Sequence, residues 1–267
     1  MSAEFARESQ VGPVTTSLAG RRTASEATGD ERVAILTYHR ILSRPAPDPM
    51  FHDVPWDEFE AQMLRVAQQG KATASVSEIC VTFDDGTVDH SRAGDLLHDL
   101  GLKGTFFVIT GEVGQEGYLN REQVRRLADQ GHRIGSHCIT HTPLTRLSPA
   151  AADAELRDSK RMLEDLIGQP VDWMAPPGGI YAPDVLRRAM AQGYGVFRTM
   201  EWGYAQTPLG GAVPCWPVLS GRGEQVFENI LRGRAGTWRY HLKNAFKKVL
   251  GEAVYSRWRD RLLTHFR

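Results

Sequence analysis

The sequence has few cysteines, no long apolar run and no excess of either charge, and each feature excludes a class of protein. Its 267 residues include only three cysteines, Cys80, Cys138 and Cys215, which show no metal-binding spacing such as Cys-x-x-Cys. We therefore expect reduced thiols and neither a disulfide scaffold nor a cysteine-zinc site. No run of about 18 apolar residues is present, so the sequence predicts no transmembrane helix.

The two ends of the sequence differ from its middle in composition. Residues 1–31 are rich in Ser, Ala, Gly, Thr and charges without a period, which predicts a disordered tail. They lack the apolar core of a signal peptide, so we expect a cytoplasmic protein. Residues 221–267 carry eleven Lys or Arg against four acids, although the whole chain has a formal net charge of zero.

This basic segment, residues 221–267, predicts a helical extension. Phe246, Leu250, Val254, Trp258 and Leu262 recur close to helical spacing, so one face can pack on the rest of the protein. Two interpretations stay open for the opposite, basic face. It is either simply solvated, or it brings the protein to anionic lipid or a lipid-linked glycan at the inner face of the membrane. We expect no nucleic-acid partner.

Two adjacent carboxylates, Asp84 and Asp85, end an apolar and β-branched segment and are followed by Gly86. Neighbouring side chains of a strand point in opposite directions, so these two need different partners unless the backbone bends at Gly86. A metal ion bound by one would relieve their repulsion and leave the other free to handle a proton. The alternative is a simple Asp-Gly turn that caps a helix over residues 91–100.

A histidine pair favours the metal interpretation. His137 and His141 follow a strand-like segment, and one helical turn would place both on the same side. Two histidines and one carboxylate form a three-ligand set that leaves coordination positions open for water and substrate. Cys138 lies between the two but is expected to point away from the ion.

These residues carry a family resemblance. Thr82–Gly86 and Ser136–His141 resemble the first two motifs of the NodB-like polysaccharide deacetylases, carbohydrate esterase family four. Leu36–Arg40 and Phe59–Met63 resemble the branch that acts on poly-N-acetylglucosamine. The resemblance covers roughly residues 33–220. It implies metal-dependent hydrolytic N-deacetylation of an amino sugar in a polysaccharide, a lipid-linked glycan or a glycoconjugate precursor.

Strand and helix patterns alternate along the chain, which indicates a parallel sheet wound with helices. The family's usual fold is a distorted (β/α) barrel with about seven parallel strands, and we predict this for residues 32–220. An open parallel α/β sheet is the runner-up. His39, Asp84 and His137 all follow the ends of predicted strands, so a barrel would gather them at one mouth. Predicted helices are 57–69, 91–100, 120–130, 149–167 and 182–192, and predicted strands are 33–38, 104–109, 132–136, 171–175 and 194–198.

The resemblance and the chemistry of amide hydrolysis assign roles to the clustered polar residues. Asp85, His137 and His141 would hold one divalent metal, for which Zn²⁺ fits best, although Co²⁺, Ni²⁺, Fe²⁺ or Mn²⁺ could substitute. Asp84 would be the general base. His39 would be the general acid, because an ordinary histidine pKa of about 6.5 suits donation to a leaving amine.

Two further segments are candidates for substrate binding. Pro177 and Gly178 lie in a segment that resembles the third family motif, and a backbone N–H there would help to bind the oxyanion. Trp202 belongs to an aromatic cluster, Trp202 to Tyr204, which would suit the apolar side of a sugar ring. A Trp–Tyr pair buried in the core explains the same cluster equally well.

The sequence departs from the family at two places. Ala175 stands where an arginine normally pairs with the base aspartate, so the group that holds Asp84 is unidentified. The late Leu-x-His motif that supplies the family's general acid is missing between Val213 and Gly221. Two alternatives therefore stay open: a deformylase or other amide hydrolase of the same fold, and a non-catalytic carbohydrate-binding relative.

Overall fold

Seven strands of the computed structural model pair in parallel and close into a barrel. The structure describes residues 31–44, 46, 50–69, 75–221 and 223–237. In order around the barrel the strands are β1 (Arg32–Tyr38), β4 (Glu78–Phe83), β5 (Gly104–Val108), β6 (Arg133–Ser136), β7 (Trp173–Met174), β8 (Val196–Trp202) and β10 (Gly211–Pro217). Closure comes from β10, which pairs back onto β1 at Leu36 and Thr37. The predicted barrel is thus confirmed, and the open sheet is wrong.

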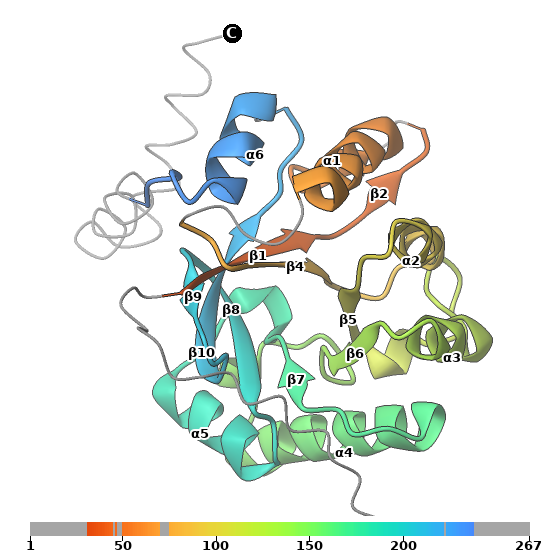
Figure 1. Ribbon diagram of the computed structural model, residues 1–267. Helices are drawn as coiled ribbons and strands as arrows, with labels where there is room; N and C mark the ends of the chain where they lie inside the picture. The colour runs from red at the N-terminus through yellow and green to blue at the C-terminus, as the bar shows by residue number, and fades with distance from the viewer. Residues whose placement is uncertain (1–30, 45, 47–49, 70–74, 222, 238–267) are drawn as a thin grey trace, which may run out of the picture.

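The helices surround the barrel (Figure 1). They are α1 (Trp56–Gln69), α2 (Asp89–Asp99), α3 (Arg121–Asp129), α4 (Pro149–Ile167), α5 (Pro183–Ala191) and α6 (Glu224–Leu231). Three short strands complete the fold: β9 (Ala205–Gln206) lies antiparallel to β1, and β2 (Ile41–Leu42) pairs with β3 (Val54–Pro55) in a separate sheet.

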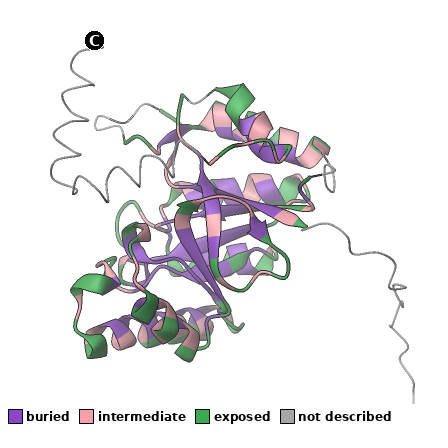
Figure 2. Ribbon diagram, turned by 90° about the vertical axis from the view of Figure 1, so that its left-hand side faces the viewer, coloured by how far each residue is buried: buried purple, intermediate pink, exposed green. Residues whose placement is uncertain are grey.

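Alternation along β1 divides the core into two layers. Ala34, Leu36 and Tyr38 belong to the cluster that packs against the surrounding helices, whereas Val33 and Ile35 belong to a second cluster inside the barrel. All five side chains are fully buried, as expected for a parallel strand covered on both faces. Figure 2 shows the strands buried at the centre, with exposed residues on the outer faces of the helices.

Local sequence signals account for most element boundaries. The Asn120 side chain accepts a hydrogen bond from the Gln123 backbone in a capping box that begins α3, and Ser148 caps α4 in the same way. Gly168, in the left-handed region at φ 68°, ends α4. The helices and strands predicted between residues 33 and 192 therefore agree with the structure to within two residues at each end.

Three predictions need correction or fall outside the described residues. The strand predicted at 194–198 is β8, which continues to Trp202, so Thr199 to Trp202 lie on a strand and not on a loop. Neither β9 nor β10 was predicted. The predicted tail at residues 1–30 and the apolar positions from Phe246 to Leu262 lie outside the described residues.

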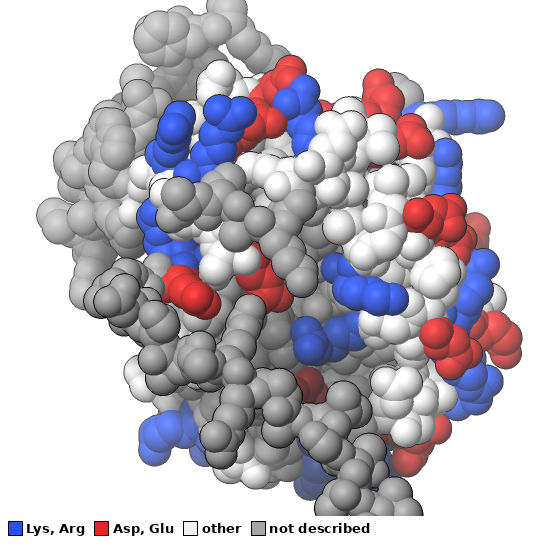
Figure 3. Space-filling model, in the orientation of Figure 1, with Lys and Arg blue, Asp and Glu red and all other residues white. Residues whose placement is uncertain are grey.

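In the part of the chain that the structure describes, no helix has the length and apolar character needed to cross a lipid bilayer. On the face shown in Figure 3, basic and acidic side chains lie next to each other along the edge at right. Such mixed charge is typical of a solvated surface.

Candidate metal centre and catalytic cavity

The ends of β4 and β1 bring two carboxylates and a histidine to one mouth of the barrel. Asp84 directly follows β4, and its backbone N–H donates to the carbonyl of Tyr38 at the end of β1. Both Asp85 and Gly86 adopt left-handed backbone conformations, with φ 77° and 72°. The expected bend thus begins at Asp85 itself, and it turns the second carboxylate toward the same cavity as the first.

Asp85, His137 and His141 form the predicted three-residue cluster. One Asp85 carboxylate oxygen, Oδ1, lies 3.4 Å from Nε2 of His137 and 3.4 Å from Nε2 of His141. The three donor atoms all lie within 4.8 Å of one another. Nδ1 of His137 donates to the Ala175 carbonyl at 2.8 Å, which leaves the Nε2 lone pair free for an ion. Two imidazoles and one carboxylate fit a divalent metal.

The segment that joins the two histidines is not a helical turn, and that expectation was wrong. Cys138 and His141 both adopt left-handed backbone conformations, with φ 64° and 57°. The imidazole centroids nevertheless lie only 4.9 Å apart. Cys138 is fully buried in the core, away from the cluster, and burial raises the pKa of its thiol.

Glu155 on α4 holds this segment in shape. Its Oε2 accepts hydrogen bonds from the backbone N–H groups of Ile139 and Thr140, at 2.7 and 3.1 Å. Its Oε1 accepts one from the Thr140 hydroxyl at 2.8 Å. The Glu155 side chain is buried, so these three bonds fix a backbone that has no regular secondary structure of its own. Sequence reasoning missed this residue.

Arg198 is the partner of Asp84 that the sequence left unidentified. Its guanidinium donates from Nη2 to both oxygens of the Asp84 carboxylate, and both side chains are buried. Arg198 comes from β8, whereas Ala175, the position expected to hold an arginine, follows β7. Burial alone would raise the pKa of Asp84, but Arg198, with help from His137 and His39, lowers it below its usual value. Asp84 is therefore ionised.

His39 lies beside this ion pair. Its Nε2 is 3.7 Å from Oδ2 of Asp84. Burial lowers the pKa of His39 from 6.5 to about 4, although Asp84 and Asp85 oppose the shift. The argument from an ordinary histidine pKa is thus wrong, and the ring is neutral at neutral pH in the free protein.

One cavity of about 490 Å³ lies at the carboxyl ends of the strands, and its wall includes His39, Asp84, Asp85, His137 and His141. Gly178 lines it, as predicted, but Pro177 and Trp202 are not among the described residues of its wall. Trp202 instead packs near Trp216, with ring centroids 6.3 Å apart, in the cluster between barrel and helices. The interpretation of Trp202 as a core residue therefore fits its position. Residues of the wall that the sequence did not suggest are Met50, Phe51, His52, Thr87, Tyr118, Met200, Pro217 and Leu219.

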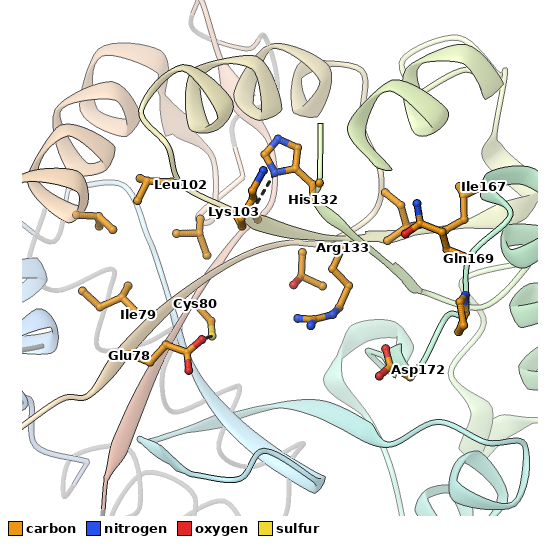
Figure 4. Close-up of a pocket in the computed structure, with 17 residues that line it drawn as sticks. Glu78, Ile79, Cys80, Leu102, Lys103, His132, Arg133, Ile167, Gln169 and Asp172 are labelled. Atoms are coloured by element: carbon orange, nitrogen blue, oxygen red, sulfur yellow. Dashed lines mark hydrogen bonds between the residues drawn. The ribbon is translucent and has the colours of Figure 1, made fainter. Parts of the chain in front are cut away.

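A second cavity, of about 480 Å³, lies at the opposite mouth, where β4, β5 and β6 begin. Figure 4 shows its polar side chains, which include Glu78, Lys103, Arg133 and Asp172. Lys103 donates to the Gln130 carbonyl, and Arg133 lies over the Trp173 ring at 4.6 Å. These two cations are engaged by the protein itself, whereas Asp84, Asp85, His137 and His141 converge at the first mouth.

Comparisons with known proteins agree with this geometry. The family model for polysaccharide deacetylase matches residues 71–197. A Bacillus subtilis protein named as polysaccharide deacetylase YxkH is 31% identical over 195 residues, which cover 67% of this chain and 68% of that protein. The peptidoglycan-N-acetylglucosamine deacetylase of Bacillus cereus is 30% identical, over 51% of this chain and 61% of its own length. A chitooligosaccharide deacetylase of Rhizobium leguminosarum is 31% identical, over 46% and 55%.

Solved structures share the fold. The Streptococcus pyogenes deacetylase PplD, in complex with acetate, superposes with a TM-score of 0.69 and 23% identity, covering 78% of this chain and all of that one. IcaB from Ammonifex degensii gives a TM-score of 0.60 and 21% identity, covering 78% of this chain and 98% of its own. At these identities the likeness concerns the arrangement of the barrel only.

Proposed function

Because the chain belongs to the polysaccharide deacetylase family, we propose that it hydrolyses the N-acetyl group of an amino sugar within a glycan. The observation that carries this proposal is the arrangement around Asp85: two imidazole nitrogens lie 3.4 Å from one of its oxygens, beside a buried and ionised Asp84. The similarity to deacetylases of peptidoglycan and chitooligosaccharides supports an N-acetylated sugar as the substrate.

The side chains of the cavity divide the work of the reaction. Asp85, His137 and His141 would hold a divalent metal, for which we propose Zn²⁺. When bound, it would polarise the amide carbonyl and lower the pKa of water toward ~7. Asp84 takes the proton of the attacking water, because Arg198 keeps its carboxylate ionised and fixed in direction. Gly178 lines the cavity and offers its backbone near the reacting group.

His39 is the proposed donor to the leaving amine. It lies within 3.7 Å of Asp84, so the proton that Asp84 takes from water can pass to the imidazole and then to the amine. His39 is neutral in the free protein because burial lowers its pKa to about 4. Negative charge that develops in the cavity during attack would raise this pKa and let the ring accept the proton.

The branch and the cellular location are part of the proposal. The resemblance of the segments Leu36–Arg40 and Phe59–Met63 supports a surface glycan related to poly-N-acetylglucosamine as the substrate. We propose a cytoplasmic protein whose basic segment, residues 221–267, contacts anionic lipid or a lipid-linked glycan.

An acetate-release assay tests the proposed function. The purified protein would be loaded with Zn²⁺, Co²⁺, Ni²⁺ or Mn²⁺ and incubated with N-acetylglucosamine oligomers, peptidoglycan fragments and N-formylated analogues. We expect acetate and a free amine, both by mass spectrometry, and one metal ion per chain by elemental analysis. Formate release alone would identify a deformylase. Glycan binding without any release would identify a non-catalytic relative.

A further inference from the structure

Phe51 is exposed at the rim of the catalytic cavity. Its side chain is 76% exposed, which is the largest value among the large apolar residues of the described part of the chain. It also lines the cavity that contains Asp84 and Asp85. Leaving a phenylalanine in water forgoes about 2 kcal/mol of burial free energy, part of which a ligand that covers the ring would recover.

The turn that carries Phe51 is fixed to the barrel. Asp53 is buried and accepts hydrogen bonds from Nε and Nη2 of Arg40, at 2.8 and 2.6 Å. The same carboxylate accepts a bond from the Met50 backbone at 2.7 Å, and the Asp53 backbone donates back to the Met50 carbonyl. Bidentate bonds of this kind set both position and direction. Phe51 is therefore presented at the tip of a braced turn.

Phe51 is also the outer end of a row of rings. Its centroid is 4.8 Å from that of His52, whose centroid is 4.3 Å from that of His39. His39 in turn lies 3.7 Å from Asp84. Phe51 thus lies two ring-to-ring contacts away from His39, the residue beside Asp84, and a sugar ring stacked on Phe51 would lie one contact further out. It is not the ring that carries the reacting acetamide but a neighbour of it.

The chemistry of the surroundings favours a neutral sugar ring as the occupant. The guanidinium of Arg40 is bound to the buried carboxylate of Asp53, so this pair adds no net charge beside Phe51. An aromatic face with one free side suits the apolar C–H face of a pyranose. A site that binds a lipid surface would instead combine a cluster of cations with several apolar side chains that insert into the lipid.

We propose that Phe51 is the stacking platform for a sugar ring next to the one that is deacetylated. This inference rests on the proposed function. It assigns a binding site to a braced turn that precedes the segment matched by the family model, residues 71–197.

Steady-state kinetics of Phe51→Ala and Phe51→Trp on N-acetylglucosamine and on its tetramer test the proposal. For Phe51→Ala we expect the ratio of kcat/KM on the tetramer to kcat/KM on the monomer to fall about 5- to 10-fold, through KM, because one aromatic contact contributes about 1 kcal/mol. Phe51→Trp keeps a ring and should keep the ratio. Leu64→Ala is the matched control, since Leu64 is an exposed apolar residue on α1 and not part of the cavity wall.

A binding measurement separates failure of this inference from failure of the proposed function. Calorimetry measures the affinity of the tetramer for the Asp84→Asn protein, with and without Phe51→Ala. The Asp84→Asn change prevents turnover, so the measurement reports the contribution of Phe51 to binding alone. Weaker binding on removal of the ring supports the platform even if no acetate is released from any glycan. Equal affinities, or an equal loss of kcat/KM on monomer and tetramer, would overturn it. So would a loss of binding to anionic vesicles with unchanged tetramer affinity, which would make Phe51 a membrane contact.

Discussion

The guanidinium of Arg198 binds both carboxylate oxygens of Asp84, although the two residues lie 114 positions apart. Arg198 thus does from β8 what the family resemblance expects of an arginine at position 175. Breaking a buried ion pair by removing one partner costs about 3–5 kcal/mol, because the other charge is left without compensation.

We therefore expect Arg198→Met to lower the free energy of unfolding by roughly this amount. It should also raise the pKa of Asp84, since burial would then be opposed only by the smaller effects of His137 and His39. Turnover should fall about 100-fold, and the acid limb of the pH–rate profile should move to higher pH. The double variant Arg198→Met with Asp84→Asn should recover much of the lost stability but no activity. An unshifted acid limb in Arg198→Met would show that Arg198 does not control the base.

The Arg198→Met variant allows a test of whether an arginine at position 175 can replace the one at position 198. Ala175 is fully buried, and its carbonyl accepts the bond from His137. In the Arg198→Met background, Ala175→Arg should return part of the lost turnover by placing a cation beside Asp84 from β7. In the unmodified protein the same Ala175→Arg change should only destabilise, because it overpacks the core. Thermal unfolding and acetate release on the four proteins give the comparison.

Measurements of metal content should distinguish the three proposed metal ligands from the proposed base, Asp84. Asp85→Ala, His137→Ala and His141→Ala should each lose metal and activity together, because two remaining donors hold an ion poorly. Asp84→Asn should keep the metal and lose at least ~100-fold in turnover. Elemental analysis and kinetics on the same preparations provide both values. Full metal content in all three ligand variants would place the metal elsewhere.

Glu155 should control metal affinity without touching the metal. Glu155→Ala removes the three hydrogen bonds that shape the segment before His141, so we expect a dissociation constant for Zn²⁺ that is about 10- to 100-fold higher in a chelator competition. Thr140→Val removes only one of the three and should have a smaller effect. A dissociation constant for Zn²⁺ that is unchanged in Glu155→Ala would contradict this role.

The depressed pKa of His39 predicts a pH dependence of stability. The folded protein binds this proton with a pKa of about 4, against about 6.5 in the unfolded chain, so the unfolded chain binds more protons between these values. Stability should therefore fall as the pH drops from 6.5 to 4, by roughly 3 kcal/mol from this group. Asp84 and Asp85, whose pKa values are lowered, lose their contribution only below about pH 4.

Denaturant unfolding of the metal-free protein between pH 7 and 4 measures the effect. His39→Gln should flatten the curve in this range, whereas His98→Gln, on the exposed side of α2, should leave its slope as it is. A curve for His39→Gln that is parallel to that of the unmodified protein would mean that His39 keeps an ordinary pKa when folded.

The sequence predicted those parts of the site that depend on neighbouring residues. An apolar strand that ends in Asp84 and Asp85 is visible as a pattern, and so is the pair His137 and His141. Arg198 was invisible, because it lies within the apolar strand β8 and its partner becomes a neighbour only when the barrel forms. Closure by β10 was missed for the same reason: its pairing with β1 joins residues far apart in the chain.

Other misses came from burial and backbone conformation. The pKa of His39 could not be inferred from its place at a strand end, because burial sets it. The spacing of His137 and His141 fits one turn of helix, yet Glu155 fixes a different backbone that brings the same rings together. An aromatic cluster in the sequence does not say whether it faces a cavity, and Trp202 faces the core.

The two strands that complete the ring lie outside the segment that family comparison detects. β1 ends before residue 71 and β10 begins after residue 197. A fragment cut to the detected segment would also lose most of β8, of which only Val196 and Phe197 remain. It would leave β4 and this short remnant as free sheet edges, with unpaired N–H and C=O groups that can template pairing between molecules. Such a fragment should precipitate on expression, so ring closure and not sequence similarity sets the smallest soluble unit of this protein.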